Sequence, residues 1–380
     1  MLPIVLLAAP LLPGQGNDLL PRIREKMTGV LLRQPNYTCT ETVERSRQAA
    51  GGRSKIEDTL RLEVALVDGK EMFAWPGSKQ FEDHKLEDLV TTGMFGNGNF
   101  AIYARILFLS NVAVFEDRGE TQWGGRPARR YDFRVSRVTS GHWLRVNGRE
   151  ALVGFHGSFY ADPVTLDLRR VEVVAEDIPA ELGLTATETS VDYGRRRIGD
   201  EEFLLPVESR VMMERPDGVD RNWVRFADCR RFTGESTLSF DDPILTEGSA
   251  PAGRVKEVEI PAGLTLQLQL EELDLMQAAV GDAISATLRG DLRNHRQLLA
   301  PKGSMARGRI VRLDRFSTYF SLQIQFEDLE WPGGHARLKL IFDQPAFPTR
   351  LIRGAQDGSI AIQRQGRPPL SGILMFWRSE

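Results

Sequence analysis

The sequence predicts a mostly β protein with few helices, divided into two domains. Its 380 residues favour two domains over one, and a hydrophobic content of 41% is sufficient to form real cores. Long stretches alternate apolar and polar residues, which is the period of a β-strand with one buried face. Turn-forming residues separate these stretches at Asp162-Pro163, Gly199-Asp200 and Pro216-Asp217-Gly218. Short strands joined by such turns are typical of antiparallel sheets.

The first 16 residues have the features of a secretory signal peptide. Their apolar run of about ten residues is too short to span a bilayer but suits the hydrophobic region of an export signal. Pro3, Pro10 and Pro13 argue against a buried first strand, although no Lys or Arg precedes the run. We therefore predict an exported protein, periplasmic or secreted, with residues 1–16 as its signal. No later stretch predicts a transmembrane segment in the mature chain.

An amphipathic helix is predicted over residues 17–34. Apolar residues recur there at helical spacing, with charged residues between them, and Pro35 ends the helix. The apolar positions are Leu20, Ile23, Met27, Val30 and Leu31.

Further along the chain, apolar residues recur at every second position instead of at helical spacing. Leu60, Leu62, Val64 and Leu66 alternate with other residues, and Asp68-Gly69 is a hairpin turn signal. Further strand-like runs follow, and together they predict an antiparallel meander. These runs cover residues 71–75, 122–137, 142–146, 151–160, 166–174, 185–193, 202–213 and 222–232.

One segment interrupts the predicted meander. Residues 91–99 are rich in Gly and Asn, which indicates a flexible loop. Residues 100–111 then show helical spacing. A helix inserted here can plug or cover the concave side of a curved sheet, so we predict a lid formed by Gly93, Gly96, Gly98 and Phe100.

A domain boundary is predicted at residues 243–259, which are rich in small and polar side chains. The first domain then covers residues 17–242 and the second covers residues 260–380. In the second domain, apolar and polar residues alternate over residues 264–270, and a closing strand is expected at residues 373–377. Many short strands with Gly and Pro turns predict a small β-barrel or sandwich.

The order of elements in the first domain carries a family resemblance. A helix, hairpins, a mid-domain helix and further hairpins follow one another, and Gly157–Glu172 reads as strand, Asp-Pro turn and strand. This order resembles the LolA/LolB-like lipoprotein-carrier fold, and the resemblance implies a curved antiparallel half-barrel packed on two helices. Four segments also resemble a family of exported acidobacterial proteins without an assigned activity: Pro35–Cys39, Asp192–Gly194, Phe203–Pro206 and Thr233–Ser236.

The second domain carries a fainter resemblance in its turn residues. Ile260–Gly263, Val280–Asp282 and Ala300–Gly303, followed by Gly308–Ile310, are similar to turns in the barrel of TrbI/VirB10-type secretion components. These glycines and prolines specify turns and not chemistry, so no secretion function follows from them.

The two cysteines, Cys39 and Cys229, both stand in strand-like contexts. An even cysteine count in an exported chain favours a disulfide, while two buried free thiols are the alternative. The bond would make the first and last strands of the first domain near neighbours. Nothing beside either cysteine suggests a reactive thiol.

Signals for catalysis, metals and cofactors are weak. The five histidines lack metal-ligand spacing. His156 stands near Ser158 and Asp162, but no Gly-x-Ser-x-Gly elbow accompanies them. We predict no catalytic residue, no metal and no cofactor. A net charge of −3 with dispersed Lys and Arg predicts no nucleic-acid partner.

Large apolar side chains define the predicted binding surface. We expect them to line the inner face of the curved sheet, around a cavity for a lipid, an acyl chain or a lipoprotein; core packing against the two helices is the alternative. They are Phe73, Trp75, Phe155, Phe159, Met213 and Trp223.

The leading functional hypothesis is a non-enzymatic cell-envelope protein that binds a hydrophobic ligand or an envelope partner through this concave face. Two alternatives stay open. One is a structural or assembly component that docks through the second domain, and the other is a hydrolase with an unrecognised site.

Overall fold

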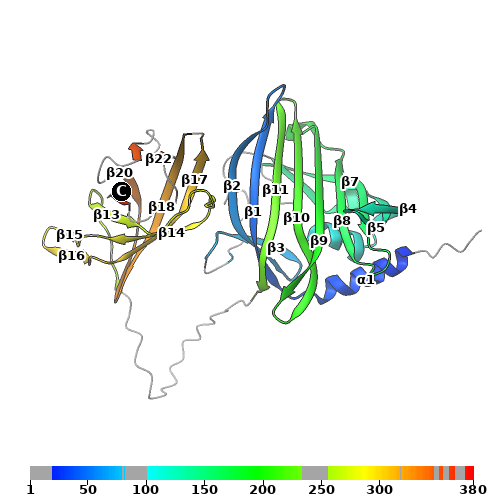
Figure 1. The fold of residues 1–380 in the computed structure, drawn as a ribbon, viewed down its shortest axis with the longest axis horizontal. Coiled ribbons are helices and arrows are strands. Elements are labelled where there is room, and N and C mark those ends of the chain that lie inside the picture. The colour runs from blue at the N-terminus through cyan, green and yellow to red at the C-terminus, as the bar shows by residue number, and fades with distance from the viewer. Residues whose placement is uncertain are drawn as a thin grey trace, which may run out of the picture.

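The structure is a computed structural model that describes residues 19–78, 81, 101–146, 148–232, 256–316, 318–345, 351–353, 359–363 and 373–380. The predicted mostly β fold is confirmed. Within these residues the chain forms an 11-stranded sheet, a 10-stranded sheet and a two-stranded hairpin. Figure 1 shows the two large sheets beside each other, each built from one half of the chain.

The 11-stranded sheet is antiparallel throughout, with the order β3-β2-β1-β11-β10-β9-β8-β7-β5-β4 and with β6 paired to β7. Most neighbours are consecutive in sequence, as the predicted meander requires. The strands are β1 (Tyr37–Ala49), β2 (Lys55–Val67), β3 (Lys70–Ala74), β4 (Ala113–Trp123), β5 (Arg126–Val135), β6 (His142–Val146), β7 (Arg149–Ala161), β8 (Leu168–Glu176), β9 (Ala186–Ile198), β10 (Glu201–Arg215) and β11 (Gly218–Arg231).

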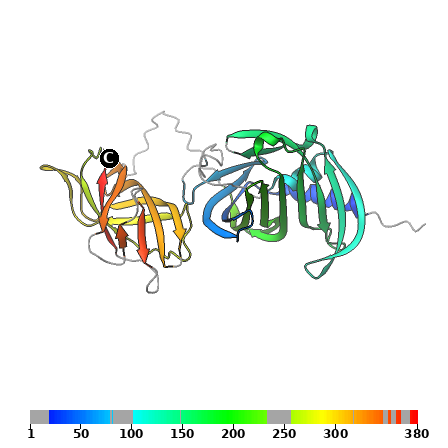
Figure 2. The ribbon, with the colours of Figure 1, turned by 90° about the horizontal axis from the view of Figure 1, so that it is seen from above.

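Two helices lie on the inner side of this sheet, which curls around them in Figure 2. α1 (Leu19–Arg33) buries Ile23, Met27 and Leu31, which lie on one face at a spacing of four residues. α3 (Ile102–Leu109) packs into the same apolar cluster as α1 and the inner residues of β5, β7, β8 and β9. The predicted half-barrel on two helices is confirmed. The described residues also include a one-turn helix, α4 (Arg137–Ser140), which was not predicted from the sequence.

A disulfide joins Cys39 of β1 to Cys229 of β11, which confirms the predicted pairing. The two Cα atoms are 4.1 Å apart although 190 positions separate the residues in sequence. β1 and β11 are hydrogen-bonded neighbours along most of their length, so the bond reinforces the pairing of the first and last strands of the sheet.

The 10-stranded sheet has the order β12-β19-β18-β17-β14-β13-β23-β20, with β22 on β18 and β21 on β22. Among the described strands this order has two ends and does not close into a barrel. β12 falls inside the predicted linker of residues 243–259, while residues 243–255 lie outside the described residues. The strands, including the separate β15–β16 hairpin, are β12 (Lys256–Glu257), β13 (Thr265–Leu270), β14 (Ala283–Leu288), β15 (Leu292–Asn294), β16 (Gln297–Ala300), β17 (Met305–Arg315), β18 (Tyr319–Trp331), β19 (Gly334–Arg337), β20 (Leu340–Pro345), β21 (Leu351–Arg353), β22 (Ile360–Gln363) and β23 (Leu374–Ser379).

Candidate functional site

The inner face of the half-barrel beside the helices is a filled aromatic core. Phe155 and Phe159 are fully buried. The Phe159 ring lies 5.0 Å from the Tyr131 ring and 5.3 Å from that of Phe108 on α3, and the Phe155 ring lies 5.7 Å from the ring of Tyr103 on α3. Offset and edge contacts at these distances stabilise a packed interior. Phe155 and Phe159 therefore pack in the core, the alternative that the sequence left open.

The other predicted cavity residues lie apart from one another. Phe73 is buried in the apolar cluster that includes β1 and β2, and Trp75 packs against the same cluster at the second domain. Met213 belongs to a small separate cluster with Val211. The predicted lid residues Gly93, Gly96, Gly98 and Phe100 lie outside the described residues.

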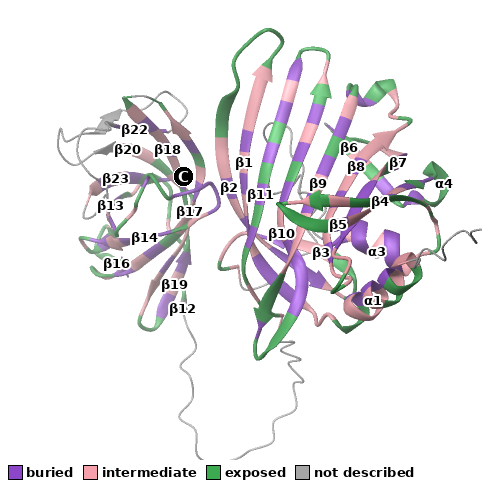
Figure 3. Ribbon diagram, turned by 45° about the vertical axis from the view of Figure 1, so that its right-hand side comes forward, coloured by how far each residue is buried: buried purple, intermediate pink, exposed green. Residues whose placement is uncertain are grey.

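Trp223 requires a correction, because it faces outward and not into the half-barrel. Its neighbours Asn222 and Val224 on β11 are buried, whereas Trp223 is 36% exposed. Successive side chains of a strand point to opposite faces, so Trp223 must lie on the outer face. Figure 3 shows the alternation of buried and less buried residues along β1, β11 and β10.

Polar side chains are also enclosed inside the half-barrel. Glu41 of β1 is fully buried between its cross-strand neighbours Leu62 and Phe226, and neither carboxylate oxygen has a hydrogen-bond partner among the residues that the structure describes. Burial raises the pKa of Glu41 well above its ordinary value, and the nearby Glu71 raises this pKa further. Burial therefore favours the protonated, neutral form of Glu41.

His142 lies against the aromatic core. Its Nε2 is 3.5 Å from the Tyr103 hydroxyl oxygen, and its ring lies 5.7 Å from the Phe155 ring. Burial lowers the pKa of His142 to about 4, so the imidazole is neutral at neutral pH. Glu41 is 0% exposed and His142 is 6% exposed. Neither side chain is therefore accessible to a substrate.

A hollow of about 700 Å³ opens on the outer face of the sheet, across β1, β11, β10, β9 and β8. We call it the Trp223 hollow. The strand register places its outward-facing side chains in two rows that run across the strands. One row runs from Glu44 through Trp223 to Glu172, and the other runs from Ser46 through Met212 to Val174. Its outward-facing residues are Glu44, Ser46, Arg170, Glu172, Val174, Glu188, Ser190, Arg210, Met212, Arg221 and Trp223.

Trp223 occupies the first of these rows with a guanidinium on either side. The Arg225 guanidinium carbon lies 4.5 Å from the Trp223 ring centroid, and that of Arg210 lies 5.9 Å away. Such cation–π contacts cover part of the indole and leave part of it exposed.

The charges of the Trp223 hollow divide into paired and unpaired groups. Arg170 forms ion pairs with Glu172 at 2.7 Å and with Asp192 at 2.9 Å. Arg210 forms one with Glu208 at 3.0 Å. Glu44 and Glu188 form no ion pair among the residues that the structure describes. Arg225, beside the Trp223 ring, also forms no ion pair among these residues, so both carboxylate and guanidinium groups flank the apolar surface.

A second hollow, of about 480 Å³, lies between α1 and the end of α3. Its polar groups are already bonded to each other: Thr28 Oγ1 donates to the Phe108 carbonyl at 2.9 Å, and Arg24 Nη2 donates to Asn111 Oδ1 at 2.7 Å. This hollow therefore offers less unsatisfied polar surface to a ligand than the Trp223 hollow does.

The described part of the chain contains neither a cluster of metal ligands nor a helix suited to crossing a membrane. No three His, Cys, Asp or Glu side chains there are grouped so that they could hold a metal ion. None of the described helices combines the length and the hydropathy that a membrane crossing needs.

Comparison with known proteins adds little to this picture. No family model matches the chain, and no curated protein matches it. Several solved structures are similar to this chain, and two of them match it at low scores. One is a domain named for outer membrane lipoprotein sorting, from Vibrio parahaemolyticus, with 11% identity, a TM-score of 0.32 and coverage of 58% of this chain and 95% of that one.

The other similar structure is a DUF1329 family protein from Desulfovibrio piger, with 14% identity, a TM-score of 0.30 and coverage of 57% of this chain and 92% of that one. At such scores neither likeness carries a function over to this chain. Nothing in the comparisons supports the resemblance of the second domain to TrbI/VirB10-type barrels.

Proposed function

We propose that this is an exported, non-catalytic docking protein that binds an amphipathic segment of a partner protein in the Trp223 hollow. The observation that carries the proposal is the hollow itself, which has a volume of about 700 Å³ and is lined by an exposed Trp and by two carboxylates that form no ion pair with the described residues. The predicted concave site is the less favoured location, because α1 and α3 fill the inner face beside them.

The residue types in the Trp223 hollow favour a protein as the occupant. Trp, Met and Arg are enriched at protein interfaces, and Trp and Arg dominate the residues that contribute most to binding. Trp223, Met212, Arg210 and Arg221 meet on this face. An acyl chain alone would leave Glu44 and Glu188 without a partner, whereas a segment that carries both apolar and basic side chains satisfies both parts of the surface.

Export is proposed on independent grounds. The Cys39–Cys229 disulfide is a covalent bond of the kind that persists in oxidising compartments and is rare in the cytosol. A lipoprotein partner would fit the same proposal through its polypeptide part, and a free lipid would not.

Peptide binding tests the proposed docking surface. A basic amphipathic peptide of Lys and Leu is titrated against the full chain by calorimetry, with an acidic Glu/Leu peptide and phosphatidylglycerol vesicles as comparisons. We expect the basic peptide to bind best. Trp223→Ala should weaken that binding by about 30-fold, the effect of losing a dominant interface residue.

The matched control is Trp143→Ala, since Trp143 is 49% exposed on β6 and lies outside the Trp223 hollow. This control should leave peptide binding unchanged. Equal losses in the two variants, or stronger binding of the acidic peptide or the vesicles, would refute the docking proposal.

A further inference from the structure

The two domains meet along a strand edge of the first sheet. β3 pairs with residues 63–67 of β2, so the earlier part of β2 has no partner on that side within the 11-stranded sheet. Val280 of the second domain takes that place. Its N–H donates to the Thr59 carbonyl at 2.8 Å, and the Arg61 N–H donates to the Val280 carbonyl at 2.8 Å. Leu60 and Val280 thus form a parallel β-bridge between the domains.

The next residue, Gly281, shows that this contact is closely fitted. Its φ is +98°, in the region that favours glycine. A Cβ atom at this position would lie 2.3 Å from the Arg61 carbonyl oxygen and 2.6 Å from Cε3 of the Trp75 ring. Trp75 therefore packs against a turn of the second domain, where the Arg309 guanidinium carbon also lies 5.6 Å from its ring centroid.

A charge-assisted contact adds to the bridge. Arg61 Nη1 donates to both carboxylate oxygens of Asp282, at 2.6 and 2.7 Å, and Arg61 Nη2 donates to the Gln277 carbonyl at 3.2 Å. Asp282 also accepts the N–H of Ala279 at 2.8 Å, so one carboxylate shapes the turn and binds the first domain. Hydrogen bonds between ionised groups are roughly twice as strong as neutral ones.

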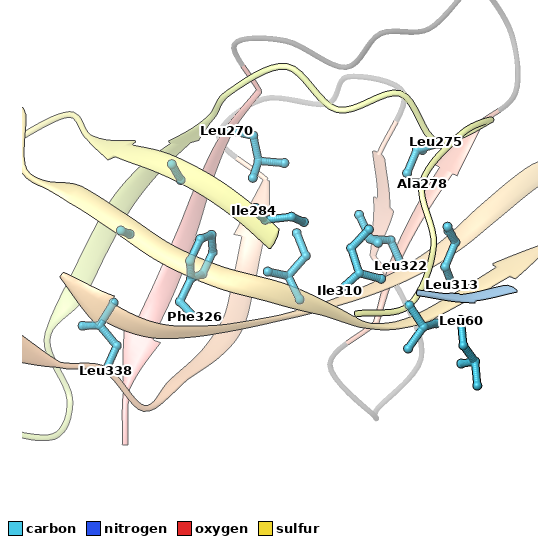
Figure 4. Packing of buried hydrophobic residues seen from close by; sticks show 14 of the residues in the cluster. Leu60, Leu270, Leu275, Ala278, Ile284, Ile310, Leu313, Leu322, Phe326 and Leu338 are labelled. Atoms are coloured by element: carbon cyan, nitrogen blue, oxygen red, sulfur yellow. The ribbon is translucent and has the colours of Figure 1, made fainter. Parts of the chain in front are cut away.

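The apolar cores of the two domains are continuous at this contact. Leu60 of β2 is 2% exposed and belongs to the same buried cluster as the core of the second domain. Figure 4 shows Leu60 beneath Ile310 and Leu313 of β17, with Leu275 and Ala278 of the docking turn nearby. Leu60 thus lies where the apolar cores of the two domains meet.

We infer that residues 275–282 form an intramolecular strand-addition element that binds the open edge of β2, holds the two domains together and occupies an edge that would otherwise accept a strand from a second copy of this chain. Unpaired N–H and C=O groups on an edge strand are a template for such pairing, and a covering segment prevents it. This inference is independent of the Trp223 hollow. The disulfide lies within the first sheet, so it does not tether the domains.

Cleavage between the domains tests the inference on the full chain. A specific protease site is inserted within residues 243–251, the purified protein is cleaved, and the two halves are separated by size with light scattering over a dilution series. We expect the halves of the otherwise unchanged chain to stay together at micromolar concentration. Arg61→Ala should weaken their association by about tenfold or more.

Arg230→Ala is the matched control, because Arg230 forms an ion pair with Glu63 at 2.9 Å on the same sheet but within the first domain. It should leave the association unchanged. Gly281→Ala provides a second disruption from the other side of the contact, and circular dichroism of both halves shows whether each variant has folded.

The released first domain should then form dimers or larger species through β2. Halves that separate without any substitution, or equal effects of Arg61→Ala and Arg230→Ala, would overturn the inferred contact. A released first domain that stays monomeric at high concentration would overturn its capping role.

Discussion

Two buried ionisable side chains, Glu41 and His142, make opposite contributions to the pH dependence of folding. Burial favours the neutral form of each side chain, and this form carries a proton in Glu41 and lacks one in His142. The free energy of unfolding therefore responds to each in the opposite direction.

Replacing Glu41 with Leu is expected to stabilise the fold by about 1–3 kcal/mol near neutral pH, the usual cost of a buried polar group without a partner. The folded-state pKa of Glu41 lies above 4.5, so the folded chain keeps a proton that the unfolded chain releases above that pH. The unchanged chain thus loses stability as pH rises from 4.5 through the folded-state pKa, and the gain from Glu41→Leu grows over the same range.

Urea unfolding at several pH values measures this gain. Glu120→Leu, at an exposed position on β4, is the control and should show no such growth with pH. A gain from Glu41→Leu that is the same at every pH would contradict a protonated Glu41.

His142 governs the acid side. Its folded-state pKa of about 4 lies below the ordinary value of 6.5, so its contribution to stability is complete above pH 6.5 and is lost as pH falls toward 4. The loss amounts to about 3 kcal/mol at most. His142→Phe removes the titrating group and should flatten this part of the pH–stability curve. An unchanged slope between pH 6.5 and 4 in urea unfolding would contradict a buried neutral imidazole.

At the scale of elements, strands in which apolar and polar residues alternate regularly could be predicted from the sequence. Strands without this alternation were not predicted. β1 has Glu41 and Arg45 at inner positions, so polar residues break the expected apolar pattern. β4 is an edge strand with mostly exposed side chains, and the run predicted at residues 122–137 crosses its turn into β5 at Gly124 and Gly125.

The predicted orientation of Trp223 was wrong for a related reason. β11 presents its largest aromatic residue outward and the polar Asn222 inward, against the usual rule for a half-buried strand. A local pattern cannot reveal such an inversion, because only the packing of the whole sheet against α1 and α3 fixes which face is inside.

The pairing of β1 with β11 joins the first and last strands of the first domain. Removing its disulfide in Cys39→Ser/Cys229→Ser should lower the free energy of unfolding by about 2–5 kcal/mol, because the unfolded chain regains the freedom of a long loop. Urea unfolding with and without reductant measures this. Reductant should destabilise the original chain and leave the double variant unchanged; destabilisation of both would show that reductant acts elsewhere.

At the scale of the whole molecule, the mostly β fold could be predicted from the sequence, while the contact between its two large sheets could not. From the sequence, Val280–Asp282 were interpreted only as turn residues. Their role depends on an edge of β2 that lies more than 200 positions earlier, since Leu60 and Val280 meet only in the folded chain. Contacts between distant segments leave no periodic signal in a single sequence.

The binding surface predicted from the sequence and the one proposed from the structure also differ at this scale. The sequence suggested the concave side because half-barrels often enclose a cavity there. In this chain α1 and α3 fill that side, and the open surface is the Trp223 hollow on the outer face.

Site-specific photo-cross-linking tests the docking surface most directly. A photoreactive residue is placed at Met212, inside the Trp223 hollow, or at Val164, which is 85% exposed in a turn outside it. The basic amphipathic peptide should cross-link at Met212 and not at Val164, and Trp223→Ala should abolish the product. Cross-linking at Val164 as strong as at Met212, or a Met212 product that survives Trp223→Ala, would contradict docking in the Trp223 hollow.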